Sequence, residues 1–205
     1  MAAFTAALVA GDRDGARGIA TEYLAATASR LTVISDLLHP AQYQIGELWY
    51  EGVLGVAEEH RATAIVAAVA AAMPTTPVVN PVRAGARCLL SAVGAEQHVV
   101  GLQLLALALE DEGWNVDQLA PPTPGSELMR AVVAWKPDVV GLSAAYMPAT
   151  REITETVRQV KANGVPVLVG GPLFNRLSGL WRSIGADAHG SDARVATVLM
   201  RKFLR

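Results

Sequence analysis

The 205-residue sequence predicts an N-terminal four-helix bundle followed by an α/β domain with a doubly wound, five-stranded parallel sheet. Residues 1–73 show helical periodicity and no strand pattern. Residues 74–86 then hold three prolines, which cannot continue a helix. From residue 87 onward, short apolar runs alternate with helical patterns, as in domains built on a parallel sheet. We therefore expect a helical-bundle domain over 1–73, a proline-rich linker over 74–86 and a sheet domain over 87–205.

Four helical patterns make up the predicted bundle, over residues 2–10, 12–27, 31–49 and 56–73. Gly11 stops the first pattern, and Asp12 can cap the second helix. Pro40 interrupts the third pattern, so we expect a kink or a break there, because proline lacks the N–H that a helix interior needs. Gly52 and Gly55 bracket a tight turn before the last, alanine-rich helix. Helices joined by such short connections indicate a small bundle.

Five short apolar runs after the linker predict strands, and the residues between them have helical patterns. Runs with little polar alternation indicate parallel strands that are covered on both faces. The expected strands are Cys88–Val93, Asn115–Ala120, Val139–Ala144, Val165–Gly170 and Ala186–His189, with helices over 99–112, 127–136 and 151–162, a short one through Trp181 and one at the C-terminus. This alternation is typical of a flavodoxin-like (Rossmann-like) sheet, whose ligands bind beyond the carboxyl ends of the strands. We therefore look for chemistry in the loops after Val93, Ala144 and Val169.

Composition excludes several classes of protein. A hydrophobic content of 52% excludes intrinsic disorder. With 17 basic against 19 acidic residues and no basic cluster, we expect no direct binding to nucleic acid. The single cysteine, Cys88, cannot form an internal disulfide and suits a reducing cytoplasm. The longest apolar run, Ala64–Met73, is far shorter than the ~20 residues that span a bilayer, and the N-terminus lacks the basic region of a signal peptide. We therefore expect a soluble, cytoplasmic protein without membrane association.

The loop after the first predicted strand holds a carboxylate and a histidine two residues apart, Glu96 and His98. Such a histidine can offer one ring nitrogen to a metal while the carboxylate holds the other ring N–H. Gly101 lacks a Cβ, so a flat, bulky ligand could approach the backbone there. In the alternative, structural role, His98 caps the following helix and Glu96 stabilises its N-terminal dipole. Taken by itself, this loop favours the structural role.

Glu96-Gln97-His98-Val99-Val100-Gly101 resembles the axial-histidine motif of cobalamin-binding domains, Asp/Glu-x-His-x-x-Gly. In that family, Ser-x-Leu follows at the end of the third strand and Gly-Gly at the end of the fourth. Here Ser143 follows Gly101 after 41 intervening residues, a separation typical of the family, and Gly170-Gly171 ends the fourth predicted strand. Ala145 stands where the family usually has leucine.

The resemblance implies a role for each matching residue. His98 would be the lower axial ligand of cobalt in place of the nucleotide base, and Glu96 would fix the tautomer of its imidazole. The displaced nucleotide tail would enter a slot lined by four residues of the motif: Gly101, Ser143, Gly170 and Gly171. Because Ala145 departs from the family pattern, this slot would have a different shape.

The predicted hairpin between the third and fourth helices carries Trp49 at the end of one helix and Glu59-His60 one turn into the next. From the residues alone, Trp49 is most simply a core residue, whereas packing explains a Glu-His pair beside an apolar run less well. The hairpin resembles the cap of light-sensing adenosylcobalamin proteins of the CarH/LitR type, whose Trp…Glu-His signature has the same spacing. The resemblance implies that Trp49, Val56, Glu59 and His60 enclose the upper adenosyl group. Those sensors have a histidine at the position of Tyr50 that ligates cobalt after light, so His60 or water would have to serve here.

The resemblance implies a sensor and not an enzyme. Light would break the cobalt–carbon bond of adenosylcobalamin, and the output would pass through a light-dependent homo-oligomer or an unidentified effector protein or domain. The first alternative is a corrinoid methyl carrier of a methyltransferase system, although such carriers normally have Phe and Glu-Leu at the positions of Trp49 and Glu59-His60. A cobalamin storage or delivery module and a flavodoxin-like domain for another small molecule are further alternatives. The related photocobilins also bind a bilin, biliverdin, but no residue of this sequence identifies a bilin site.

Overall fold

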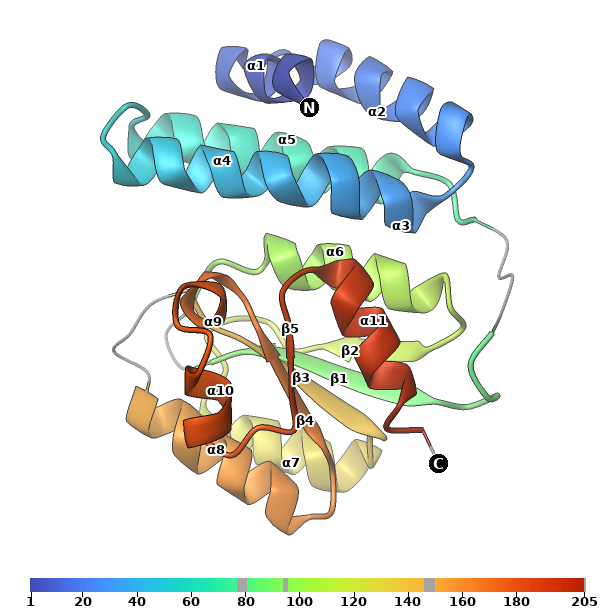
Figure 1. Cartoon of the computed structure of the whole chain (residues 1–205), viewed down its shortest axis with the longest axis vertical. Helices are drawn as coiled ribbons and strands as arrows, with labels where there is room; N and C mark the ends of the chain where they lie inside the picture. The colour runs from blue at the N-terminus through green and yellow to red at the C-terminus, as the bar shows by residue number, and fades with distance from the viewer. Residues whose placement is uncertain (77–80, 94–95, 146–149, 205) are drawn as a thin grey trace. The chain divides into compact units, whose positions relative to one another are not determined.

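The computed structural model describes residues 1–76, 81–93, 96–145 and 150–204. Part of the predicted linker, residues 77–80, lies outside the described residues, and so do Gly94 and Ala95 of the predicted site loop. The chain forms two compact units, Met1–Pro77 and Val78–Arg205 (Figure 1). Across the described residues, none of the helices combines the length and the hydropathy that a membrane crossing requires.

The first unit is entirely helical over residues 1–76. Its elements are α1 (Ala2–Ala10), α2 (Arg13–Thr27), α3 (Arg30–Val33), η1 (Ile34–Leu38), α4 (His39–Tyr50) and α5 (Val56–Ala72). Gly11 ends α1 with a left-handed φ of 75°, and the carboxylate of Asp12 accepts the N–H of Gly15 at 2.9 Å, as predicted for the cap of α2. Fully buried apolar side chains form the core: Phe4, Leu8, Ile34, Leu37, Leu38, Ile45 and Ile65.

The third helix does not break at Pro40. α3 passes through η1, a π-helical turn, into α4 without an intervening loop. In this turn the N–H of His39 donates to the carbonyl oxygen of Ile34, five residues back. A π turn takes up one extra residue, so the helix accommodates the proline ring and its missing N–H without ending. Of the kink or break expected at Pro40, the break is absent: the helix continues past Pro40, and the irregularity there is the π turn.

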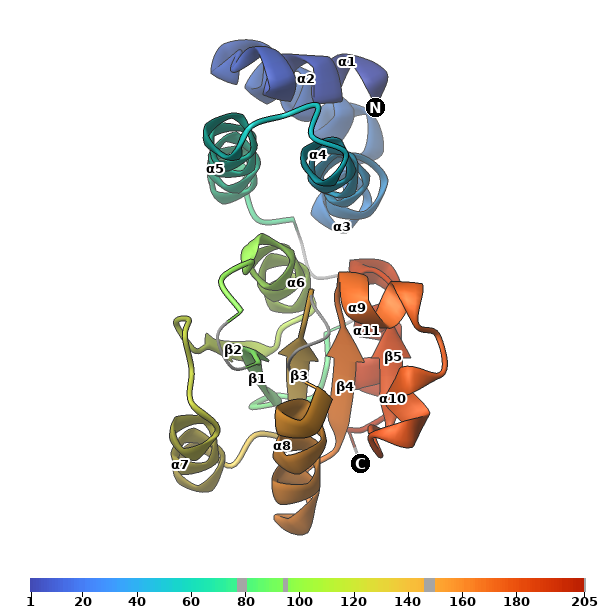
Figure 2. The same ribbon diagram turned by 90° about the vertical axis from the view of Figure 1, so that its left-hand side faces the viewer.

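The predicted hairpin joins α4 to α5. Gly52 adopts a left-handed φ of 75° in the turn, and Gly55 precedes the first residue of α5. The N–H of Gly55 donates to Oε2 of Glu58 at 2.7 Å, which satisfies one of the backbone groups at this helix end. The two helices lie side by side, as the end-on view of Figure 2 shows. This hairpin carries all of the predicted cap residues.

The second unit contains one sheet, and all of its described strands are parallel. The strands are β1 (Arg87–Ala92), β2 (Asn115–Gln118), β3 (Val139–Ser143), β4 (Val167–Gly170) and β5 (Ala188–Gly190), in the order β2-β1-β3-β4-β5. This is the flavodoxin-like order, so the predicted fold class is confirmed. The strand order reverses between β1 and β3, and the ligands of such sheets bind beyond the carboxyl ends of the strands at this point.

Helices cover both faces of this sheet. Figure 1 shows α6 (Val100–Glu110) and α11 (Ala193–Arg201) on one face, with α7 (Gly125–Trp135) and α8 (Thr150–Ala162) on the other. The short helix predicted through Trp181 is α10 (Leu180–Ser183), and a second short helix, α9 (Pro172–Arg176), precedes it. Strands, α7 and α8 share a buried apolar cluster that includes Leu89, Leu128, Val132, Val140, Leu142, Ile153, Val157, Val167 and Val169.

Candidate functional site

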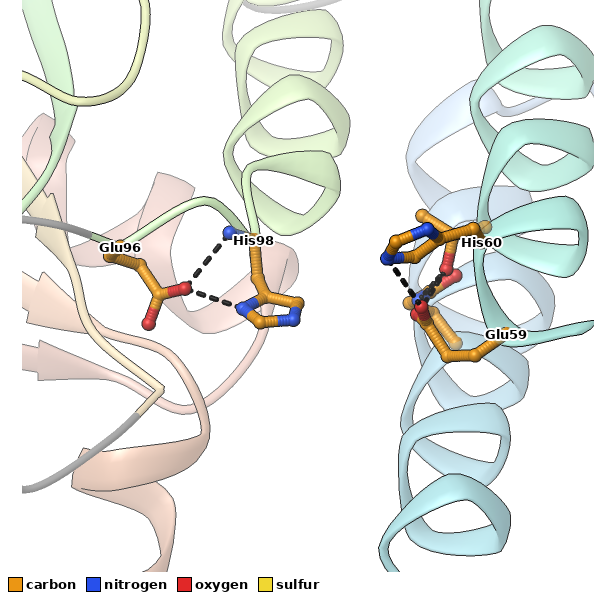
Figure 3. Close-up of polar contacts among 6 residues, drawn as sticks. Glu59, His60, Glu96 and His98 are labelled. Carbon is orange, nitrogen blue, oxygen red and sulfur yellow. Dashed lines mark hydrogen bonds and ion pairs between the residues drawn. The ribbon is translucent and has the colours of Figure 1, made fainter. Parts of the chain in front are cut away.

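Glu96 and His98 lie between β1 and α6, beyond the carboxyl end of β1. Oε1 of Glu96 lies 2.5 Å from the ring Nδ1 of His98 and accepts the backbone N–H of the same residue at 2.9 Å. An ionised carboxylate only accepts hydrogen bonds, so Nδ1 carries the proton and Nε2 has the lone pair in the neutral ring. Figure 3 shows Nε2 on the side of the ring that faces away from Glu96. The nitrogen that can ligate a metal is therefore held in a fixed direction.

Glu96 also connects this loop to the end of β3. Its Oε2 accepts the N–H of Ala145 at 2.8 Å, and 49 positions separate the two residues in the sequence. The side chain of Glu96 is only 6% exposed. Burial raises the pKa of Glu96, but the hydrogen bonds from His98 and Ala145 outweigh burial and lower the pKa below its ordinary value. Glu96 is therefore a buried anion that fixes His98 relative to β3.

The residues predicted to line the nucleotide slot lie at the strand ends and at the start of α6. Ser143 and Gly170 are paired in the sheet, and Gly101 lies in the first turn of α6. Gly171 has a φ of 96°, and a Cβ there would lie 2.7 Å from the carbonyl oxygen of Ala144. No side chain fits at residue 171 without a shift of the backbone. Because residue 171 is glycine, no side chain projects from the carboxyl edge of the sheet at this point.

Two features of this edge were missing from the predicted site. The backbone of Ala145 anchors Glu96, whereas the sequence shows Ala145 only as a departure from a motif. Gly190 is paired with Gly170, and a Cβ on it would lie 2.8 Å from Cβ of Ala196 in α11. The only sequence signal for Gly190 is that a short apolar run ends in glycine.

The predicted cap residues come from the end of α4 and the first turns of α5. Trp49 is half-buried, whereas Val56 is 56% exposed and Tyr50 is 75% exposed. Glu59 is buried, and the neighbouring side chain of His60 is 72% exposed. Oε2 of Glu59 lies 3.7 Å from Nε2 of His60 (Figure 3), beyond hydrogen-bond distance.

Two polar side chains inside the bundle hold Glu59. The hydroxyl of Thr63 donates to Oε1 of Glu59 at 2.7 Å, and Nε2 of Gln42 donates to Oγ1 of Thr63, also at 2.7 Å. Gln42 belongs to α4 and Thr63 to α5, so these bonds cross the hairpin. The sequence analysis missed both residues, although the spacing of four between Glu59 and Thr63 places them on one helix face.

Contacts in the structure join one glutamate–histidine pair in each unit. Glu59 and His60 are neighbours in Met1–Pro77, and Glu96 contacts His98 and the end of β3 in Val78–Arg205. Each group contains a buried carboxylate beside a more exposed imidazole.

Comparison with known protein families gives a match in both units. A family model described as a B12 binding domain matches residues 86–198, and a second model with the same description matches residues 1–73. The first match covers more than half of the chain and includes Glu96, His98, Ser143, Gly170 and Gly171.

Two curated relatives come from Myxococcus xanthus. The HTH-type transcriptional repressor CarH is 33% identical over 169 residues, which cover 81% of this chain and 55% of CarH. The HTH-type transcriptional repressor CarA is 33% identical over 120 residues, which cover 58% of this chain and 41% of CarA. The chain therefore spans about half the length of these relatives.

Among solved structures, the monomethylamine corrinoid protein of Methanosarcina barkeri is similar over 98% of this chain and 96% of its own. The TM-score is 0.79 at 17% sequence identity. At this identity the likeness shows a shared fold.

Proposed function

The chain belongs to the B12-binding domain family, and from this premise we propose that it is a light sensor that binds adenosylcobalamin in the base-off, histidine-on form. The observation that carries the proposal is the anchored ring of His98, with Nδ1 2.5 Å from Glu96 and Nε2 facing away from it. The light-sensing part is supported by 33% identity to CarH over most of this chain and by the CarH/LitR-type signature of the hairpin.

The sheet unit fits the lower half of a base-off corrinoid. A cobalt ion that has lost its own nucleotide base needs one neutral nitrogen ligand, and His98 presents one in a fixed direction. Glu96, which three hydrogen bonds hold in place, would keep that ring oriented. The displaced nucleotide tail would lie along the carboxyl edge of the sheet, at Ser143, Gly170 and Gly171, and beside Gly101 at the start of α6.

The bundle fits the upper ligand of an adenosylated corrinoid. Trp49 offers an aromatic face for a nucleobase, and Glu59 offers carboxylate oxygens for ribose hydroxyls. Val56 and His60, both exposed, would pack around the same group. A methyl group has neither an aromatic ring nor a hydrogen-bond donor, so this set of side chains favours the larger ligand.

When bound, adenosylcobalamin supplies a cobalt–carbon bond that visible light cleaves. Contacts that Trp49 and Glu59 make only while the adenosyl group is present stabilise one state of the protein over the other. A ligand shifts an equilibrium only by such differential contacts. Their loss would change the packing of the bundle and thereby self-association or the binding of an effector. A second, bilin chromophore such as biliverdin would add its own absorption bands to the same spectra.

The proposal is tested by absorption spectra and size-exclusion chromatography of protein loaded with adenosylcobalamin, before and after green light. We expect a base-off, histidine-on spectrum in the dark and a shift in elution volume after light. Methylcobalamin-loaded protein is the matched control, since a methyl carrier would bind it equally well. Identical dark and lit elution volumes, together with equal affinity for both cobalamins, would favour a methyl carrier or a storage module.

A further inference from the structure

We propose that Thr63 and Gln42 are positioning residues that hold Glu59 for recognition of the upper ligand, and thereby set the preference for an adenosyl over a methyl group. This inference rests on the proposed function. It concerns a chain of three side chains that crosses the α4–α5 hairpin, with donor–acceptor distances of 2.7 Å at each step.

The direction of this chain of hydrogen bonds follows from the chemistry of its members. An ionised carboxylate has no proton to give, so Glu59 can only accept from Thr63. The hydroxyl of Thr63 has one proton, and it donates that proton in the hydrogen bond to Glu59. The same oxygen must therefore accept the hydrogen bond from Gln42. The amide of Gln42 therefore presents Nε2 to Thr63 and not Oε1. The charge of Glu59 thus orders all three side chains.

The two oxygens of Glu59 have different surroundings. Oε1 is engaged by Thr63, whereas Oε2 lies 3.7 Å from Nε2 of the exposed His60. A carboxylate that is 8% exposed and engaged on one oxygen holds its second oxygen in a fixed direction, where it can accept a hydrogen bond from a ligand. Ribose hydroxyls are donors of this kind, and a methyl group is not.

The cost of the arrangement indicates a role besides packing. Oε1 of Gln42 is buried and has no hydrogen-bond partner within the described residues. A buried carbonyl without a partner destabilises a fold, and a core selected for stability alone would favour an apolar side chain at this position. Orientation of Glu59 gives a reason to keep the amide.

The positions of these residues match those of the proposed ligand contacts. Gln42 and Trp49 are seven residues apart and share one face of α4. Val56, Glu59 and Thr63 follow one another at spacings of three and four, so they share one face of α5. The positioning residues therefore lie one to two turns from the side chains proposed to contact the adenosyl group.

Equilibrium binding of adenosylcobalamin and methylcobalamin in the dark tests the inference. Thr63→Val keeps the shape of the side chain and removes the donor to Glu59. We expect it to reduce the preference for adenosylcobalamin about tenfold while the affinity for methylcobalamin stays the same. Thr63→Ser, which keeps the hydroxyl, should keep the wild-type preference for adenosylcobalamin. Gln42→Met should give a smaller loss, about threefold, because it removes a neutral donor one step away.

The control is Thr27→Val in α2, whose hydroxyl donates to the carbonyl oxygen of Tyr23 within its own helix. It should leave the preference unchanged. The inference is overturned if Thr63→Val keeps the wild-type preference, if Thr63→Val lowers both affinities equally, or if Thr63→Ser loses the preference for adenosylcobalamin. If Thr63→Val does not fold, the affinity ratios of Gln42→Met and Thr63→Ser test the inference in its place. Wild-type protein that binds neither cobalamin would instead contradict the proposed function itself.

Discussion

Each unit of the molecule contains a glutamate–histidine pair, and the two pairs are built in opposite ways. In the sheet unit, Glu96 lies 2.5 Å from Nδ1 of His98 and also accepts its backbone N–H. In the bundle, Glu59 lies 3.7 Å from Nε2 of His60, and its short hydrogen bond goes to Thr63. Both carboxylates are buried, with 6% and 8% of the side chain exposed, whereas the histidines are 49% and 72% exposed.

The difference shows which member of each pair is held in place. The hydrogen bonds of Glu96 orient an imidazole, as a metal ligand requires. The hydrogen bond from Thr63 orients the carboxylate of Glu59 itself, and His60 stays at the surface. One pair is therefore suited to present a nitrogen to a metal and the other to present an oxygen to a hydrogen-bond donor. Substitutions at the two histidines and at the two glutamates can separate these roles, and substitutions at one glycine in each unit compare the backbones around them.

Removal of the two histidines should give the largest contrast. His98→Ala takes away the proposed cobalt ligand, so we expect loss of the base-off, histidine-on spectrum and a fall in cobalamin affinity of roughly 100-fold or more. His60→Ala is the matched control from the other pair, and it should keep that spectrum in the dark. A His98→Ala protein with an unchanged spectrum would mean that another group ligates the metal.

Substitution of the two glutamates should give a smaller and qualitatively different contrast. Glu96→Gln places an amide where three donors, the ring and the backbone N–H of His98 and the N–H of Ala145, need acceptors, so at least one of them faces an NH₂ group. We expect cobalamin affinity to fall about 10- to 100-fold, whatever the upper ligand. Glu59→Gln should alter only the ratio of adenosylcobalamin to methylcobalamin affinity, by at least about tenfold, because Thr63 acts through this carboxylate. Titrations with both cobalamins measure the two effects, and a uniform loss in both variants would remove the distinction between the pairs.

Substitution of one glycine in each unit tests how tightly the sheet edge and the α4–α5 hairpin are packed. Gly171 and Gly52 both have left-handed φ angles, 96° and 75°. A Cβ at Gly171 would meet the carbonyl oxygen of Ala144 at 2.7 Å, whereas nothing lies within 4 Å of one at Gly52. We expect Gly171→Ala to lower the free energy of unfolding of the sheet unit by about 2 kcal/mol, and Gly52→Ala to cost the bundle about 1 kcal/mol. Hydrogen exchange resolves the stability of each unit, and equal costs would show that the sheet edge is no more tightly packed than the hairpin.

The fold was predictable because its signals are local. Apolar runs mark β1 to β5, and the turn residues Gly11, Gly52 and Gly55 stand where the helices end or begin. Pro40 was the exception, since a proline in a helical pattern marks a disturbance but does not specify whether the helix breaks or a π turn accommodates the ring. The same limit explains α9, which is too short to show a periodic pattern.

The candidate site was predictable only in part. The Glu96–His98 contact follows from a spacing of two residues in one loop. The bond from Ala145 to Glu96 spans 49 positions and depends on the pairing of β1 with β3. Thr63 and Gln42 are similarly joined across a hairpin: the spacing of four places Thr63 on the same helix face as Glu59, but no local pattern links Thr63 to Gln42. Long-range hydrogen bonds thus supply what the local pattern leaves open.

A third histidine, His189 in β5, has an amide partner and extends the comparison. Nδ2 of Asn175 donates to the carbonyl oxygen of Ser191 at 3.0 Å, so its Oδ1 faces Nε2 of His189 at 2.8 Å and accepts the proton there. A neutral acceptor does little to stabilise a charged imidazole, and burial lowers the pKa of His189 below its ordinary value of about 6.5.

The sign of the pH effect at His189 follows from this lowered pKa. As pH falls through about 6.5, the unfolded chain takes up a proton before the folded protein does. The contribution of His189 to stability is therefore complete above that pH and is lost as pH falls towards the lowered pKa of the folded state. This effect should be the smallest of those predicted, because one partly exposed group carries it. Unfolding of wild-type protein and of His189→Gln, measured from about pH 8 to pH 5, should show a shallower decline in the variant. Parallel declines would mean that folding leaves the pKa of His189 unchanged.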